Sequence, residues 1–267
     1  MAMNVVVCIK QVPDTTNVRI NPETNTLMRE GVESIVNPFD EYALEQGLLL
    51  RDRCGAKLTV VSMGPPQATA VLREALARGA DAAFLVSSRA FGGADTLATS
   101  YTLAQAIRKA CGGVPDLVLF GKQAIDGDTA QVGPGVSEFL GVPLVTYVRQ
   151  LTVDGKAFRA ETVMDDGVVT VEGHLPAVMT VLKEADAPRY APLSGAIRAA
   201  TAQVTVLNEK DIAAEPVKIG LKGSPTKVVT IFPPPVKGGG EKVTASGDEA
   251  AKAILSFLER KGLVKHG

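Results

Sequence analysis

Apolar runs alternate with segments of helical periodicity through the first half of the chain. Runs rich in β-branched and leucine residues, the pattern of strands buried on both faces, lie at residues 4–10, 57–63, 82–86 and 117–120. Segments whose apolar positions recur every three or four residues, the pattern of amphipathic helices, lie at residues 37–54, 67–78, 95–110 and 136–140. This alternation predicts an α/β fold, a doubly wound and mostly parallel sheet with helices on both faces.

The pattern changes to short strands after residue 141. Residues 145–151, 157–164 and 168–172 alternate, and Asp154-Gly155 and Asp165-Asp166-Gly167 stand between them. Asp-Gly steps are typical of tight hairpin turns, so antiparallel hairpins are expected beside the parallel sheet. Three further elements are predicted: strands at 177–181 and 203–207 and a small edge hairpin at 18–35.

A proline-containing loop and an aperiodic tail follow. The loop begins at residue 187 and leads into a short helix that is expected to start at Gly195 and run through Ala199. Periodicity is lost from Glu215 and returns in a helix at 247–261. We therefore expect a nucleotide-binding α/β domain at 1–208, with the loop 187–199 exposed, and an extended C-terminal arm and helix at 209–267. Packing of this arm on a partner subunit is favoured, and a mobile tail is the alternative.

Composition excludes several classes of protein. The chain has 267 residues, of which 46% are hydrophobic, enough for one large core and an extension. Its formal net charge of -1, with scattered lysines and arginines, gives no footprint for nucleic acid. No apolar run is long enough to span a membrane and no charged leader precedes the first strand, so a cytoplasmic protein is expected.

Cysteine and histidine are too few and too scattered for a metal centre. Cys8, Cys54 and Cys111 lie far apart, and only His174 and His266 could join them, so neither structural zinc nor a disulfide is expected. No arrangement for a catalytic triad or for proton abstraction is found, and we assign no catalytic residue. Any redox chemistry must therefore be carried by a cofactor.

The run GKQAIDGDTAQVGP at 121–134 stands where a parallel strand passes into a helix, the place where α/β proteins bind ligands. Gly127 and Gly133 permit tight turns, and Asp128 and Thr129 suit a helix N-cap, so the run predicts a phosphate cradle. It matches neither GxGxxG nor a P-loop, and an ordinary strand-to-helix loop is an equal alternative from these residues alone. Asp126 and Asp128 are interpreted as loop and cap residues and not as an acid–base pair.

The run FGGADTLATS at 91–100 is a second candidate. Gly92 and Gly93 leave room for close approach, Asp95 opens a helix, and Thr96 and Thr99 share one face of its first turn. Two such loops at the carboxyl ends of parallel strands favour a shared nucleotide crevice over two independent loops.

Five long motifs follow one another in the first 210 residues: CIKQVPDT at 8–15, VNPFDEYALE at 36–45, VSMGPPQA at 61–68, GKQAIDGDTAQVGP at 121–134 and APRYAPLSGAIRA at 187–199. On these motifs the chain resembles, over essentially this length, the β (small) subunit of electron transfer flavoproteins. The resemblance implies a fold like that of the adenine-nucleotide α-hydrolases and a heterodimer with an α subunit that holds a second, electron-transferring FAD. It also implies electron exchange with an acyl-CoA dehydrogenase-type flavoenzyme, and contact with a membrane only through a partner oxidoreductase.

The nucleotide of the β subunit distinguishes two subclasses of this family. Housekeeping members bind structural AMP, whereas electron-bifurcating members bind a β-FAD that accepts a hydride from NADH. GADTLATS and VPDT resemble the bifurcating members, including those associated with nitrogen fixation, and Val163 stands where some housekeeping relatives have an acidic residue. NPF at 37–39 occurs in both subclasses. The resemblance therefore favours a β-FAD, with AMP as the alternative.

Residue by residue, the resemblance assigns four groups of contacts. The phosphates are expected on the backbone of Thr129, Ala130, Gln131 and Val132, with Asp126 nearby, and the adenine on Cys8, Ile9, Asn37 and Met63. Gly127 and Gly133 join the phosphate contacts as glycines of the cradle, and Gly92, Gly93, Asp95, Thr96 and Thr99 are expected on the flavin side. The partner-recognition loop is expected to dock through Arg189, Tyr190, Leu193 and Ile197.

Two other classes of function are possible for such a chain. A non-redox nucleotide-binding regulatory module of the universal-stress type has a similar fold but would purify alone and without flavin. A stand-alone NAD-dependent oxidoreductase should have a Rossmann fingerprint and catalytic residues, which the sequence lacks.

Overall fold

The computed structural model describes residues 2–14, 19–20, 27–28, 34–227, 229, 240 and 242–264. The chain divides into two compact units, Met1–Thr230 and Ile231–Gly267. Most of the hairpin expected at 18–35 and the proline and glycine runs of the tail, together with His266, lie outside the described residues. The first unit continues past Asn208, where the sequence places a domain boundary.

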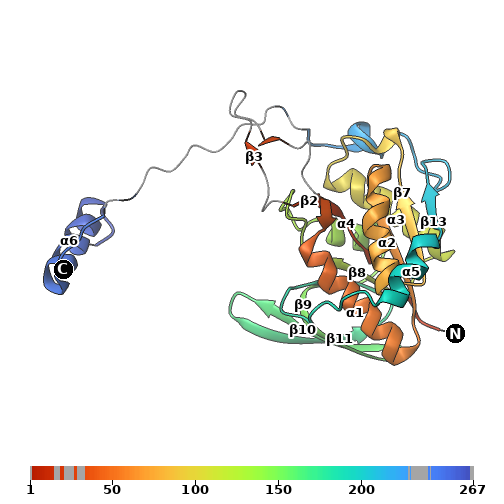
Figure 1. Ribbon diagram of the computed structural model, residues 1–267, viewed down its shortest axis with the longest axis horizontal. Coiled ribbons are helices and arrows are strands. Elements are labelled where there is room, and N and C mark those ends of the chain that lie inside the picture. Colours follow the sequence, from red (N-terminus) through yellow and green to blue (C-terminus); the bar gives the residue numbers. More distant parts are fainter. Residues whose placement is uncertain are drawn as a thin grey trace. The chain divides into compact units, whose positions relative to one another are not determined.

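One nine-stranded sheet forms the centre of the first unit, in the order β11-β10-β9-β12-β8-β1-β6-β7-β13 (Figure 1). Its strands are β1 (Asn4–Cys8), β6 (Lys57–Met63), β7 (Ala82–Val86), β8 (Leu117–Gly121), β9 (Leu144–Asp154), β10 (Ala157–Met164), β11 (Gly167–His174), β12 (Ala177–Val181) and β13 (Val204–Leu207). All neighbours from β9 to β13 are parallel, and β10 and β11 add antiparallel pairs. The predicted α/β sheet with added hairpins is confirmed.

Helices cover both faces of this sheet, because side chains alternate along each buried strand. Val5 and Val7 join a core shared with α1 (Pro38–Cys54), α2 (Thr69–Arg78) and α5 (Leu193–Thr201). Val6 and Cys8 join the opposite core, shared with α3 (Thr96–Cys111) and α4 (Val132–Leu140). Each helix thus buries one apolar stripe against the sheet.

The order of the strands places a switch point beside β1. The chain passes from β1 outward through β6 and β7, and then returns to β8 on the other side of β1. The carboxyl ends of β1, β6 and β8 therefore diverge into loops on both sides of a crevice, which is the usual ligand position in such sheets.

Short elements complete the first unit. They are β2 (Gln11–Pro13), paired with β5 (Ser34–Val36); β3 (Arg19–Ile20), paired with β4 (Leu27–Met28); and the 3-10 turns η2 (Pro66–Ala68), η3 (Arg89–Phe91) and η4 (Gly220–Gly223). The second unit contains α6 (Gly247–Arg260), which begins with a capping box between Ser246 and Glu249. None of the helices in the described ranges combines the length and apolarity of a membrane crossing.

Three helix starts differ from the sequence prediction. Helix α2 begins at Thr69 and not at residue 67, because residues 66–68 form the 3-10 turn η2. Helix α4 begins at Val132 with Gln131 as its N-cap, so Asp128 and Thr129 are loop residues and not a cap. Helix α5 begins at Leu193 and not at Gly195, because the extended residue Pro192 serves as the N-cap. Proline is compatible with a helix start, where its missing N–H costs no hydrogen bond.

Candidate functional site

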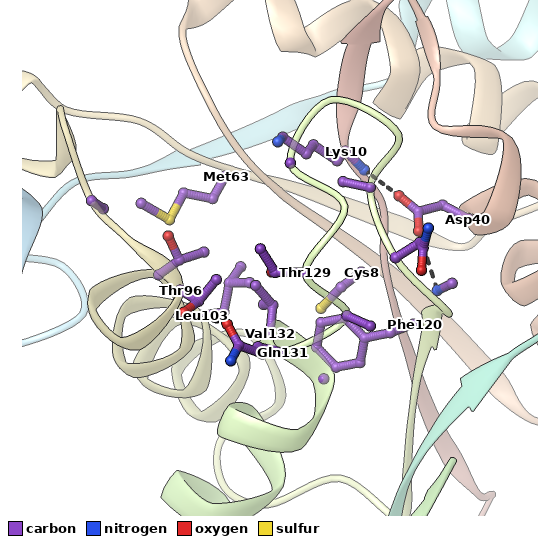
Figure 2. A pocket seen from close by; sticks show the side chains of 18 of the residues that line it. Cys8, Lys10, Asp40, Met63, Thr96, Leu103, Phe120, Thr129, Gln131 and Val132 are labelled. Carbon is purple, nitrogen blue, oxygen red and sulfur yellow. Dashed lines mark hydrogen bonds between the residues drawn. The ribbon is translucent and has the colours of Figure 1, made fainter. Parts of the chain in front are cut away.

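A cavity of about 600 Å³ opens at the carboxyl ends of β1, β6 and β8 (Figure 2). Its walls come from the loop between β8 and α4 and from the loop between β7 and α3, the two loops singled out in the sequence. Thirteen of the predicted cofactor residues line it: Cys8, Ile9, Met63, Gly93, Asp95, Thr96, Thr99, Gly127, Thr129, Ala130, Gln131, Val132 and Gly133. A hydrogen bond of 3.3 Å between the side chains of Thr96 and Gln131 joins the two walls.

Three predicted residues, Asn37, Gly92 and Asp126, do not line the cavity. Asn37 is fully buried; its amide donates to the carbonyl oxygen of Gln123 at 2.8 Å and accepts from the amide of Ile125 at 3.0 Å. The carboxylate of Asp126 pairs with the ammonium of Lys10 at 2.7 Å. Gly92 accepts a backbone hydrogen bond from a later segment of the chain. Asn37 and Asp126 thus shape the β8–α4 loop.

Asp40 is a central residue of the site that the sequence analysis missed. Its buried carboxylate accepts the backbone amide of Lys10 at 2.7 Å and that of Gly121 at 3.1 Å, so it joins the ends of β1 and β8 (Figure 2). Burial raises the pKa of Asp40 to about 7 against the opposing effect of these hydrogen bonds. A side chain at Gly121 would collide with this carboxylate, so only glycine fits there.

Other lining residues were not assigned to the site, although all of them except Leu103 and Phe120 lie inside the quoted motifs. They are Lys10, Pro65, Phe91, Ala94, Leu103, Phe120, Lys122, Gln123, Ala124 and Asp128. Cys8, one of the predicted lining residues, is a buried thiol, and burial raises its pKa well above the ordinary value. A neutral thiol of this kind packs as a small apolar group and is not a nucleophile.

The start of α4 is suited to an anion. In the described structure no side chain caps this helix, so the amides of its first turn keep their positive potential at the cavity wall. Gly133 allows this turn to approach β12, because a Cβ at that position would stand 2.8 Å from Cγ2 of Thr180. Asp128 and Ala130, just before the helix, have φ of 56° and 55°, a strained conformation that often accompanies ligand loops.

The start of α3 is different, because its own chain already supplies the anion. One carboxylate oxygen of Asp95 accepts the amides of Leu97 at 3.0 Å and Ala98 at 3.1 Å. A phosphate at this position would have to displace a bonded carboxylate of the same charge. The two helix starts therefore divide the cavity into an anion end at α4 and a neutral polar end at α3, where Thr96 and Thr99 line the wall.

The loop expected to recognise a partner presents three exposed side chains. Tyr190 is 96% exposed, Leu193 78% and Ile197 66%, although all three carry large apolar groups. Helix α5 packs on α2, and Arg73 donates to the carbonyl oxygen of Ala199 at 2.7 Å. An exposed apolar group on a firmly held helix is typical of a binding surface.

Arg189, the fourth residue predicted for this surface, is already bonded within the chain. Its guanidinium donates to the buried carboxylate of Glu45 at 2.8 Å and to Asp52 at 2.7 Å. Its backbone amide also donates to Glu45, at 3.0 Å. The side chain therefore ties the start of the loop to α1.

The described residues include no group of three or more histidine, cysteine, aspartate or glutamate side chains placed to hold a metal ion.

Comparison with known protein families identifies the family of this chain. The model of the electron transfer flavoprotein domain matches residues 24–212. The chain belongs to the electron transfer flavoprotein family. The resemblance recognised in the motifs is thereby confirmed, and the chain is a protein of flavin-linked electron transport.

Relatives match over nearly the whole chain. An electron transfer flavoprotein subunit beta of Clostridium acetobutylicum is 50% identical over 97% of this chain and 99% of its own. Subunit CarD of the caffeyl-CoA reductase-Etf complex of Acetobacterium woodii is 47% identical over 98% of this chain and 100% of its own. Protein FixA of Bradyrhizobium diazoefficiens is 45% identical over 96% of this chain and 91% of its own.

Proposed function

We propose that this chain is the β subunit of a heterodimeric electron transfer flavoprotein, and that its cavity holds a β-FAD. The observation that carries the proposal is the pair of unlike helix starts that face one cavity. The uncapped start of α4 fits a pyrophosphate, and the start of α3, whose anion position Asp95 fills, fits an uncharged polar group. AMP needs only the first of these ends, whereas FAD has a flavin to place at the second.

The residues present fit such a cofactor. Val132 and Gly133, in the first turn of α4, line the anion end, and Cys8, Ile9 and Met63 provide an apolar wall for an adenine. Thr96 and Thr99 offer hydroxyl groups at the α3 end. When bound, the flavin supplies hydride acceptance from NADH and single-electron transfer, the chemistry of electron bifurcation. The chain's own residues bind and orient this group and shield one side of it from water.

The names of the relatives support the assembly. The relatives from Clostridium and Acetobacterium are called a beta subunit and a complex subunit, and both align over nearly all of this chain. An α subunit with a second FAD is the expected partner. The Acetobacterium relative is part of a complex named for a CoA-ester reductase, which supports an acyl-CoA dehydrogenase-type flavoenzyme as the redox partner here.

The exposed group Tyr190, Leu193 and Ile197 is the surface that we assign to this flavoenzyme, with Leu193 as its anchor. Residues 231–267, which include α6, are assigned to contact with the α subunit. We place the complex in the cytoplasm, with contact to a membrane only through a partner oxidoreductase.

The test is the cofactor content of the αβ complex. The chain is coexpressed with the α subunit, and the purified complex is denatured so that released flavins and nucleotides can be separated and counted. Two FAD per heterodimer, with flavin reduction on addition of NADH, are expected. One FAD and one AMP per heterodimer would contradict the bifurcating function and support the housekeeping one. A chain that purifies alone without flavin would indicate a regulatory nucleotide-binding module.

A further inference from the structure

The segment 219–226 packs on the loop that leads into α3. The amide of Leu221 donates to the carbonyl oxygen of Gly92 at 3.1 Å. Gly220 has a φ of +54°, and a side chain there would collide with the carbonyl oxygen of Ala90. The segment thus fits closely against residues 90–93 and requires glycine at position 220. The sequence analysis assigned this segment to an aperiodic arm.

Two hydroxyl residues of the segment hold Asp95. Ser224 Oγ accepts the backbone amide of Asp95 at 2.8 Å. Thr226 donates to Oδ2 of Asp95 twice, from its amide at 3.0 Å and from its hydroxyl at 2.9 Å. The other carboxylate oxygen, Oδ1, accepts the amides of Leu97 and Ala98. Both oxygens of Asp95 are therefore used inside the protein, which leaves this carboxylate poorly placed to bind a ligand.

We propose that residues 219–226 are a structural part of the cofactor site, and that Ser224 and Thr226 are positioning residues for its α3 end. They hold Asp95, Asp95 holds the first turn of α3, and that turn carries Thr96 and Thr99 on the cavity wall. The inference rests on the proposed function, since it treats the α3 end as the flavin side. It replaces the expected direct contact between Asp95 and the cofactor by an indirect role.

The physical basis is preorganisation. A loop that is held before the ligand arrives loses less conformational entropy on binding than a loop that must be ordered by the ligand. The β8–α4 loop has supports of its own, Asn37 and the Lys10–Asp126 pair, besides the 3.3 Å hydrogen bond between Gln131 and Thr96. Loss of the hydroxyl contacts should therefore weaken ligands that reach the α3 end and spare ligands that use only the α4 end.

The experiment compares FAD with AMP in the αβ complex after its β-site nucleotide has been removed. Dissociation constants are measured for both ligands in the unaltered complex and in the double variant Ser224→Ala/Thr226→Val. We expect about tenfold weaker FAD binding in the variant, the effect of losing one hydrogen bond to a carboxylate and one to a backbone amide, and AMP binding within about twofold. The variant Ser224→Ala/Thr226→Ser, which restores the hydroxyl group at position 226 of the double variant, should recover most of the FAD affinity.

Controls separate this role from general stability and from failure of the proposed function. Thr152→Val changes an exposed threonine of β9, at the other end of the sheet, and should alter neither affinity. Gly220→Ala is a second variant that displaces the segment without removing a hydroxyl, and it should also weaken FAD selectively. Equal loss of FAD and AMP affinity, or no loss of either, would overturn the inference. An unaltered complex that binds no second FAD would instead overturn the proposed β-FAD.

Discussion

Single residues decide how closely the α4 helix approaches the sheet, and Gly133 is the sharpest case. A Cβ on Gly133 would stand 2.8 Å from Cγ2 of Thr180, whereas a Cβ on Gly127 meets nothing within 4 Å. Gly133→Ala should therefore shift the first turn of α4 and cost about 1–3 kcal/mol of stability by overpacking. Nucleotide retained through purification should fall, whereas Gly247→Ala, at an exposed glycine of α6 where a Cβ also meets nothing within 4 Å, should leave it nearly unchanged.

Thr180→Ser offers a test of the cause. Serine removes Cγ2 but keeps the hydroxyl, which accepts the amide of Tyr147 at 3.0 Å. The double variant Gly133→Ala/Thr180→Ser should regain much of the lost nucleotide content. Equal losses in the single and double variants would contradict the steric explanation.

The buried carboxylate of Asp40 predicts a pH dependence. Its pKa is raised from 3.8 to about 7 in the folded chain, so the folded state binds a proton more tightly than the unfolded state. The stability from this proton is fully present below about pH 4 and is lost as pH rises through 7, with a slope of up to about 1.4 kcal/mol per pH unit between. Denaturant unfolding of the unaltered chain and of Asp40→Asn at pH 5, 6, 7 and 8 checks this.

In that comparison the free energy of unfolding of the unaltered chain should fall, relative to the variant, as the pH increases from 5 to 7. It should run parallel to the variant from 7.5 upward. Parallel curves over the whole range would show that Asp40 is ionised throughout.

Sequence motifs identified most of the cavity residues but not these supporting ones. The glycines of the run at 121–134 mark it as a candidate loop in the sequence. The hydrogen bond between Asp40 and Gly121, in contrast, joins residues 81 positions apart. A contact of that range depends on how α1 lies against β8, which no local pattern encodes. Asn37 shows the same limit, because its position was predicted from resemblance but its role as a support of the loop was not.

At the scale of elements, strand and helix positions followed from periodicity because burial dictates them. The starts of α4 and α5 did not, since the decisive groups are backbone groups. Helix α4 begins three residues beyond Thr129 without a side-chain cap, as a ligand-binding start can, and α5 begins directly after Pro192. Side-chain cap rules predict the start of α3, where Asp95 accepts two amides, but cannot place the starts of α4 and α5, which have no side-chain cap.

The α5 element carries the prediction for partner docking. Leu193→Ala removes the more exposed of the two large apolar side chains on α5, while the packing of Gly195 and Ala199 on α2 stays intact. The KM of an acyl-CoA dehydrogenase for the αβ complex should rise about tenfold, the loss expected for an interface anchor. Electron transfer from NADH to a small dye should not change.

Val206→Ala is the matched control for this experiment. Val206 is also an exposed aliphatic residue, 57% accessible, but it lies on β13 and outside the docking group. An equal rise in KM for both variants would indicate a nonspecific apolar surface, and no rise for Leu193→Ala would remove this loop from the docking site.

At the scale of the whole molecule, the second unit has a helix without a core of its own. Helix α6 has no buried residue, and its larger apolar side chains Ile254, Leu255 and Phe257 are 61%, 47% and 40% exposed. Full burial of one such side chain contributes about 1.5–3 kcal/mol, so a partner surface that covers this stripe gains several kcal/mol. The helix is therefore expected to be stable chiefly when bound to the α subunit.

This expectation can be tested on the assembled complex. Ile254→Ser/Phe257→Ser should weaken the αβ association at least tenfold, because two apolar anchors lose their burial, while cofactor binding by the first unit persists. Lys252→Ala, an exposed polar position of the same helix, should leave association unchanged. Dissociation constants from dilution of labelled complexes measure both effects. Unaltered association of the serine variant would mean that Ile254 and Phe257 do not contact the α subunit. The division of the chain into a cofactor unit and an assembly unit would then have to be abandoned.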